Sequence, residues 1–268
     1  MDSFTFERYS VDVMLSLCYG SVVGVALGLT GAGGSILAIP LLVYGLAIAP
    51  AAAVPISLLA VGGSAIVGFI QRLRKSEVMV ATGLLVAAGG AVGAPVGAWL
   101  GEQMTGRVLM ALFGLLLLVS GVRMWQNARS DEPAAAHGCG TGKLSRRCMA
   151  VLACLGVLTG ILSGTFGVGG GFVIVPALIL VVGMDVHHAT ATSVMVIALV
   201  SGAALLSLLL RGAVISFPVA LPFMGGAVLG MAAGTVMGRR LPQKGLQQSF
   251  ALVMVGVAIY TFYSSGTH

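Results

Sequence analysis

Long apolar runs dominate the chain, and only a few charged positions interrupt them. Residues 13–71 contain no Asp, Glu, Lys, Arg or His, and further runs of this kind cover 78–101, 148–184 and 213–238. A transmembrane helix needs about 20 apolar residues, so runs of this length hold several membrane helices. The spans that we expect, each bounded by charges or by Gly and Pro, are residues 12–30, 50–71, 78–100, 107–124, 148–165, 187–210, 214–237 and 245–263.

The pattern repeats along the chain at an offset of 136 positions. The segment Gly31-Ala-Gly-Gly-Ser-Ile-Leu-Ala-Ile-Pro40 returns as Gly167-Val-Gly-Gly-Gly-Phe-Val-Ile-Val-Pro176. The match extends to Gly89-Gly-Ala-Val92 and Gly225-Gly-Ala-Val228, after which one inserted residue shifts the offset. A constant offset that carries a proline as well as glycines indicates an internal duplication.

Each glycine-rich segment opens an apolar stretch that is too short to cross a membrane as a helix. Residues 34–47 and 170–183 are 14 residues each. A helix of that length reaches about 21 Å, against a hydrocarbon core of about 30 Å. We therefore expect an all-α polytopic membrane protein with two homologous four-span repeats, each containing a glycine-broken re-entrant half-helix. If each half-helix instead crosses fully, the halves become inverted repeats of five crossings each.

A polar, glycine-rich linker joins the halves. We expect a first membrane repeat over residues 1–124, a linker over 125–147 and a second repeat over 148–268. With re-entrant half-helices, the N-terminus, the 72–75 loop, the linker and the 211 turn share one face, which carries ten of the 14 basic residues. With full crossings, the 72–75 loop, the linker and residues 239–244 share a face that carries eleven. Positive charge marks the cytoplasmic side, so the linker is cytoplasmic in either arrangement.

Composition agrees with a membrane protein and argues against several soluble classes. Hydrophobic residues make up 58% of the 268 residues and charged residues 8%, with a mean hydropathy of +1.06. Soluble domains carry about 25% charged residues. The net charge of +6 lies mainly in short loops, so it reports topology and we expect no nucleic-acid partner. The glycine runs lack the Lys-Ser/Thr of a phosphate-binding loop, and no carboxylate or histidine cluster lies in the apolar spans, so we expect no enzyme activity and no cofactor.

The cysteines and histidines carry no recognisable metal or redox motif. Cys18 and Cys154 lie in apolar spans, while Cys139 lies in the linker and Cys148 directly follows it, without paired-ligand spacing. Free thiols and no metal site are therefore expected, because the linker faces a reducing compartment. His188, at the start of the sixth span, could gate a path or carry a proton, but we favour a role in the helix start or at the membrane interface there.

A glycine break ahead of a membrane half-helix has the chemistry of an anion site. Backbone N–H groups there have no intrahelical acceptor, and the helix dipole adds about half a positive charge. Glycine also permits positive φ and close approach of the backbone to a ligand. Two such breaks facing each other would form one site near the midplane. The candidate residues are Gly31, Gly33, Gly34, Ser35, Gly167, Gly169, Gly170 and Gly171.

The alternative role for glycine in a membrane helix is close packing. Glycines that recur every fourth residue lie on one helix face and let two backbones approach. We expect this packing role for Gly20, Gly24, Gly28, Gly156, Gly160, Gly164, Gly93, Gly97 and Gly101. For the two glycine breaks, packing remains the competing interpretation.

Hydroxyl side chains recur beside the breaks. Thr30 and Thr165 precede them, and Ser57 and Ser193 lie at matched positions early in the following spans. Thr192 occurs in the second half only. These hydroxyls could complete the hydrogen bonds of an anion, although Ser and Thr in membrane helices often bond to the preceding turn of their own helix.

The two glycine segments resemble the paired signatures of the TauE/SafE-type sulfite exporters. The carrying residues are Gly28-Leu-Thr-Gly-Ala-Gly-Gly-Ser-Ile-Leu-Ala-Ile-Pro40 and Gly164-Thr-Phe-Gly-Val-Gly-Gly-Gly-Phe-Val-Ile-Val-Pro176, with the helix start His188-Ala-Thr-Ala-Thr-Ser193. The resemblance covers nearly the whole chain, including the basic turn Arg72-Leu-Arg-Lys75. It implies transport of sulfite, organosulfonates or related small sulfur oxyanions across the bacterial inner membrane, with export as the direction.

We therefore expect a secondary transporter or facilitator for a small sulfur oxyanion, with the lipid bilayer as its surroundings and a homo-oligomer left open. A different class of function is a membrane scaffold that anchors a partner enzyme through the basic cytoplasmic linker. The sequence decides neither the coupling ion nor the substrate among the sulfur oxyanions.

Overall fold

The computed structural model describes residues 3–31, 34–73, 78–129, 146–184, 186–238, 252 and 255–259. Within these ranges all regular secondary structure is helical. The elements, in chain order, are α1 (Ser3–Thr30), α2 (Ser35–Pro40), η1 (Leu41–Gly45), α3 (Pro50–Leu73), α4 (Val80–Gln103), α5 (Gly106–Arg129), α6 (Arg146–Phe166), α7 (Gly171–Ala177), η2 (Leu178–Val182), α8 (Val186–Leu210) and α9 (Phe217–Gly238).

Six of the described helices are long and apolar enough to cross a membrane. They are Val13–Thr30, Pro50–Leu73, Val80–Gln103, Cys148–Phe166, His187–Leu210 and Phe217–Gly238. Helix α5 has a shorter apolar stretch, Gly106–Val122, and most of the expected span 245–263 lies outside the described residues. The predicted all-helical, multi-pass membrane fold is confirmed at this level.

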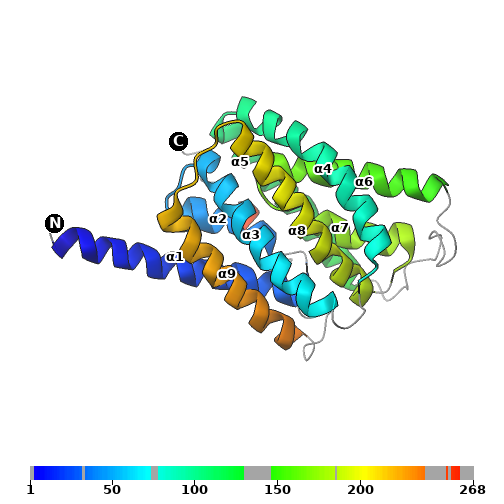
Figure 1. The fold of residues 1–268 in the computed structure, drawn as a ribbon, viewed down its shortest axis with the longest axis horizontal. Coiled ribbons are helices and arrows are strands. Elements are labelled where there is room, and N and C mark those ends of the chain that lie inside the picture. Colours follow the sequence, from blue (N-terminus) through cyan, green and yellow to red (C-terminus); the bar gives the residue numbers. More distant parts are fainter. Residues whose placement is uncertain are drawn as a thin grey trace.

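Two closely packed helix pairs form opposite edges of the bundle. Helix α1 lies along α9 at one edge and α4 lies along α6 at the other, with α3 and α8 between them (Figure 1). The expected packing role of the glycine ladders is confirmed, because a β-carbon on these glycines would run into the backbone of the partner helix. Gly24 of α1 faces Ala227 of α9, and Gly160 of α6 faces Gly90 of α4. Small residues at these positions let the backbones approach closely.

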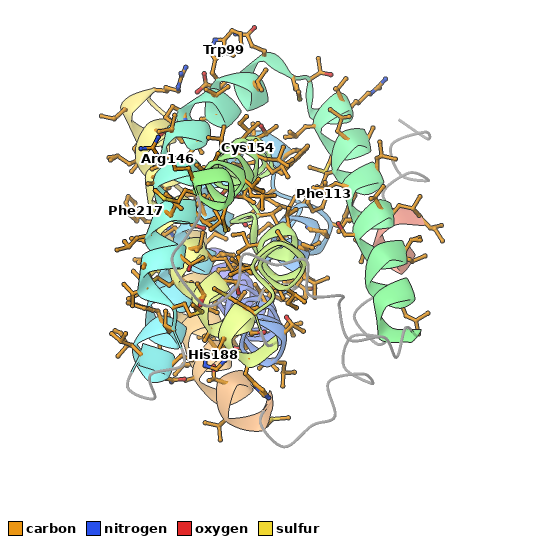
Figure 2. All side chains as sticks on the ribbon, turned by 90° about the vertical axis from the view of Figure 1, so that its right-hand side faces the viewer. Trp99, Phe113, Arg146, Cys154, His188 and Phe217 are labelled. Carbon is orange, nitrogen blue, oxygen red and sulfur yellow. The ribbon has the colours of Figure 1, made fainter. Side chains whose placement is uncertain are left out.

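Helices α3 and α8 cross the centre of the bundle in opposite directions. A β-carbon at Gly62 of α3 would meet Ser201 of α8, and one at Gly68 would meet Val194. Along this contact the residue numbers decrease in α8 as they increase in α3. The end of α3 therefore lies beside the start of α8. Figure 2 shows His188, at the start of α8, at the opposite end of the molecule from Trp99 of α4.

Arg72 and Arg211 consequently lie at opposite ends of the bundle. Arg72, at the end of α3, donates from Nη2 to the carbonyl oxygen of Gly28 in α1 at 3.1 Å. Arg211, just after α8, pairs with Glu102 at the end of α4 at 3.4 Å. The expectation that the 72–75 loop and the 211 turn share one face is wrong. That expectation rested on the short length of the half-helices alone. In the structure the chain continues past η1 as the non-helical residues 46–49 before α3 begins, which adds to the reach of the half-helix.

The expected half-helices are short and change their winding partway. Helix α2 ends at Pro40, and η1 continues it as a π-helical segment. Proline lacks an N–H and its ring clashes with the carbonyl four residues earlier, so a change in hydrogen-bond pattern is expected next to it. Helix α7 likewise passes into the π-helical η2, which ends at Gly183 with φ +73°. Each half-helix is thus only a few turns long and changes from α-helix to π-helix along its length.

The cysteines differ from expectation at one position. Cys148, buried at the start of α6, is disulfide-bonded, whereas Cys18 and Cys154 are free. The expected free thiol at position 148 is wrong. A disulfide depends on which thiols approach in space, and spacing along the chain does not determine this.

Candidate functional site

Each glycine break begins where a membrane helix ends. Gly31 follows α1 with φ +72°, and Gly167 follows α6 with φ +70°. Their N–H groups donate to Leu27 O at 2.7 Å and to Ser163 O at 2.8 Å, which closes the last turn of each helix. Glycine adopts this left-handed conformation without the steric cost that a β-carbon brings, so it stops each helix at a defined residue.

A serine from the other half of the chain holds each break in place. Ser57 Oγ in α3 donates to Gly167 O at 2.6 Å, and Ser193 Oγ in α8 shares its hydrogen between Gly31 O at 3.1 Å and Thr190 O of its own helix at 2.8 Å. Both serines are fully buried. The structure thus brings each of the two sequence-matched serines to the glycine that opens the opposite break. Because each hydroxyl donates to a backbone carbonyl, its role in this structure is to position the break.

The second break leads the chain from the end of α6 to the middle of the bundle. A β-carbon at Gly167 would lie 3.0 Å from atoms of Val54, near the start of α3. One at Gly169 would lie 3.1 Å from Val61 and 3.1 Å from Ile197, close to the midpoints of α3 and α8. If these helices span the bilayer, Gly169 therefore lies near its midplane.

Several backbone donors of the second break have no partner. No described residue accepts a hydrogen bond from the N–H groups of Val168, Gly169 or Gly170. All three residues are buried, and Gly169 and Gly170 have φ of +69° and +65°. More than nine in ten buried backbone groups in proteins are paired, so unpaired donors at such a position indicate room for an acceptor. An oxyanion supplies acceptors of that kind.

Comparison with known proteins gives the family. Residues 16–261 match the sequence pattern described as sulfite exporter TauE/SafE. The chain belongs to the TauE/SafE family. It is 34% identical over 259 residues to a probable membrane transporter protein of Xylella fastidiosa (strain Temecula1), covering 95% of this chain and 96% of the relative. It is 23% identical over 269 residues to the probable membrane transporter protein YunE of Bacillus subtilis (strain 168), covering 94% and 98%.

No solved structure matches the chain. Membership of the TauE/SafE family, together with the six apolar helices, makes this chain a multi-pass membrane transporter protein that contacts the lipid bilayer and handles a small molecule. The remaining candidate residues can be placed within that frame.

The other glycines of the TauE/SafE breaks occupy tight positions. A β-carbon at Gly34 would collide with the backbone of Ala26 and Leu27, so this glycine lets α2 pack against α1. A β-carbon at Gly170 would lie 2.8 Å from Thr159 O in α6. The packing role of glycine therefore applies at both breaks. Gly171 begins α7 and Ser35 begins α2 in a fully buried position, while Gly33 lies outside the described residues.

The three candidate threonines serve different parts of the scaffold. Thr30 Oγ1 donates to Ala26 O in its own helix at 2.8 Å, as hydroxyls in membrane helices often do. Thr165 Oγ1 donates to Gly97 O at 3.0 Å and so links α6 to α4. Thr192 Oγ1 accepts from the N–H of Met79, the residue that precedes α4, at 3.1 Å. These bonds support structural roles for all three hydroxyls.

His188 lies two residues before Thr190, whose side chain a β-carbon at Gly31 would meet. It is exposed at the start of α8, at the bottom of the view in Figure 2. Among the described residues, no three His, Cys, Asp or Glu side chains come together as metal ligands. A small pocket of about 10 Å³ lies between α4, α6 and α7, but its lining, with Val86, Leu152 and Ile174, is apolar and does not suit an anion.

Two buried hydroxyls that the sequence did not single out lie unpaired. In the described part of the chain, Ser163 Oγ in α6 and Ser201 Oγ in α8 are buried without a hydrogen-bond partner. Ser201 Oγ would lie 2.8 Å from a β-carbon on Gly169. The search for hydroxyls matched at the 136-residue offset passed over Ser201, because Ala65 stands at its counterpart. A count of polar residues at mid-span positions would have found it.

Proposed function

We propose that this TauE/SafE protein is a secondary transporter or facilitator that moves a small sulfur oxyanion, sulfite or an organosulfonate, across the bacterial inner membrane in the direction of export. The family description, sulfite exporter, supports the substrate class and the direction in this proposal, and the chemistry of the glycine breaks supports an anionic substrate. The site that we assign to the anion lies between α3, α8 and the segment 167–170.

The observation that carries the proposal is the set of buried, unpartnered N–H groups at Val168, Gly169 and Gly170. Leaving a buried donor unsatisfied costs about 1–3 kcal/mol each. An anion that accepts from these groups removes that cost and brings no need for a buried cationic side chain. The absence of ionisable residues from the surrounding apolar runs agrees with recognition by backbone dipoles.

The arrangement that we propose around this site is a pair of inverted five-element halves. Helix α3 and its sequence counterpart α8 run in opposite directions, as the contacts of Gly62 and Gly68 indicate. The bonds from Ser57 to Gly167 and from Ser193 to Gly31 relate the halves reciprocally. Transporters built from inverted repeats commonly bind substrate near the midplane, where broken helices from both halves meet. Rocking of one half against the other would then open the site to each side in turn.

Charge supports a cytoplasmic position for the linker. In the inverted arrangement the Arg72 end of α3 faces the same side as the linker, and that side carries eleven of the 14 basic residues of the chain. Arg107 and Arg211 belong to the opposite side. Basic residues concentrate in the short cytoplasmic loops of membrane proteins. The Arg211 side is accordingly the periplasmic side in our proposal.

The experiment is flux of radiolabelled sulfite in proteoliposomes that contain the purified protein, at two imposed pH gradients. Thiosulfate, sulfate and a sulfonate serve as competitors, and empty liposomes as the blank. We expect saturable sulfite flux that a sulfonate inhibits. A pH-dependent rate would identify proton coupling, and a pH-independent rate a facilitator. Absence of flux for all four anions would refute the proposal.

A further inference from the structure

Among the described membrane helices, the hydroxyl group of Ser201 shares only with that of Ser163 the lack of a hydrogen-bond partner. Ser207 in the same helix donates to Ala203 O at 2.8 Å, and Thr235 in α9 donates to Met231 O at 2.8 Å. Ser201 is just as able to bond to its own preceding turn, yet its Oγ makes no hydrogen bond and is fully buried. A buried hydroxyl without a partner destabilises a protein, so its presence needs a reason.

The position of Ser201 supplies that reason. Its Oγ lies 2.8 Å from the point where a β-carbon of Gly169 would be, so the hydroxyl faces the backbone of the second glycine break directly. The same stretch of backbone carries the unpartnered N–H groups of Val168 to Gly170. Unpartnered donors from two separate parts of the chain, α8 and the segment 167–170, therefore lie at one place.

A second unpaired hydroxyl lies beside this segment. Ser163 stands one helical turn after Thr159 in α6, and Thr159 is the residue that a β-carbon at Gly170 would meet. Residues four apart share a helix face, so Ser163 lies on the face of α6 that is turned to the break. Both of the buried, unpartnered side-chain oxygens found among the described residues are thus near residues 167–170.

We propose that Ser201 is a specificity-determining residue that donates its hydroxyl hydrogen to an oxygen of the transported oxyanion. The inference rests on the proposed function and adds a side-chain ligand to a site otherwise made of backbone. An environment that offers hydroxyl and N–H donors favours a small anion with several acceptor oxygens. It also requires glycine at 169, because a β-carbon there would take the space in front of the hydroxyl.

The test compares Ser201→Ala with wild type and with Ser207→Ala, whose hydroxyl bonds only to its own helix. For each protein, the KM for sulfite in proteoliposomes and the unfolding temperature with and without sulfite are measured. For Ser201→Ala we expect a KM about 10- to 100-fold higher, as loss of a hydrogen bond to a charged group predicts. Its unfolding temperature without sulfite should be unchanged or higher, and the stabilisation by sulfite should be reduced. Ser201→Cys has a side chain of similar size that is a weaker donor. Its KM for sulfite should fall between those of wild type and Ser201→Ala.

The outcomes separate this inference from the proposed function. Saturable wild-type flux with a KM for Ser201→Ala within twofold of wild type would overturn the role of Ser201 and leave the transporter intact. A lower unfolding temperature without sulfite, at an unchanged KM, would assign Ser201 to the fold instead. If wild-type protein neither transports nor is stabilised by sulfite, thiosulfate, sulfate or a sulfonate, the proposed function fails and this inference with it. Ser207→Ala should match wild type in every measurement.

Discussion

The hydroxyl of Ser57 donates to the carbonyl oxygen of Gly167 across 110 residues of sequence, at 2.6 Å. The bond joins α3 of the first half to the residue that ends α6 in the second half, and Ser193 makes the corresponding bond to Gly31 at 3.1 Å. Each glycine break is therefore fixed by the half to which it does not belong. In an inverted-repeat transporter, such bonds would couple the shape of each break to the relative position of the two halves.

Ser57→Ala should destabilise the protein, because the change leaves the buried carbonyl of Gly167 without its donor. We expect a loss of about 1–3 kcal/mol, measured as unfolding free energy in detergent. Ser64→Ala is the matched control, since Ser64 in the same helix donates only to Val61 O in its own turn, at 3.1 Å. An equal effect of the two substitutions would contradict a special role for the bond between the halves.

Gly170→Ala should reduce transport and stability together. The residue has φ +65°, and a β-carbon there would lie 2.8 Å from Thr159 O, so alanine meets both strain and a backbone contact. Left-handed backbone at a residue other than glycine costs about 1–3 kcal/mol. Gly225→Ala in α9 is the control, because a β-carbon at Gly225 has nothing within 4 Å. Normal sulfite flux in Gly170→Ala would place the site elsewhere.

The sequence predicted the helical membrane fold well because long apolar runs and their charged boundaries carry that information locally. Six of the eight expected spans begin and end within about three residues of the six long apolar helices among the described residues. The packing glycines were also predictable, since spacing by four is a property of one helix. The paired serines Ser57 and Ser193 were found through the repeat, although their acceptors in the opposite breaks became visible only in three dimensions.

Other features depend on contacts between segments that are distant in the sequence. Spacing along the chain does not predict such contacts. The sequence register pairs Gly89 with Gly225, but in the structure Gly89 packs against Ala153 O, and the matching contact, to Leu17 O, is made by Gly226. The inserted residue therefore precedes this segment. Likewise, Ser201 has no counterpart in the first half, so repeat symmetry could not indicate it. The disulfide at Cys148 is a third feature of this kind.

The buried Arg72 should contribute more to stability than the exposed Arg211. Arg72 is 7% exposed and donates to a carbonyl in the last turn of α1, where a cation also meets the negative end of the helix dipole. Arg72→Gln should lower the unfolding free energy by about 1–3 kcal/mol. Arg211 and Glu102 form a surface pair with side chains 35% and 41% exposed, so Arg211→Gln should cost below about 1 kcal/mol. The unfolding free energy of each variant is measured by chemical unfolding in detergent. A larger loss for Arg211→Gln than for Arg72→Gln would refute the prediction that Arg72 contributes more to stability.

Deletion of residues 131–143 should leave transport almost unchanged if the protein is a transporter and not a scaffold. These residues belong to the predicted linker and to neither glycine break. We expect sulfite flux within about twofold of wild type in proteoliposomes, since no proposed ligand is removed. A variant that inserts normally but loses all flux would contradict that expectation and favour a role for the linker in function.

Single cysteines should reveal the direction in which the helices cross. In a cysteine-free background, Leu73→Cys at the end of α3 and His187→Cys at the start of α8 should react with a membrane-impermeant thiol reagent from the same side. Val214→Cys, 84% exposed after α8, should react from the other side. The distance between the ends of α8, 25 residues long, is about 37 Å, enough to separate the two faces of a bilayer. Labelling of residues 73 and 214 from one side would contradict the opposite directions of α3 and α8 in the structure. Labelling of 73 and 187 from the cytoplasm would support both the inverted halves and the charge-based orientation, because the eleven basic residues then lie on that side.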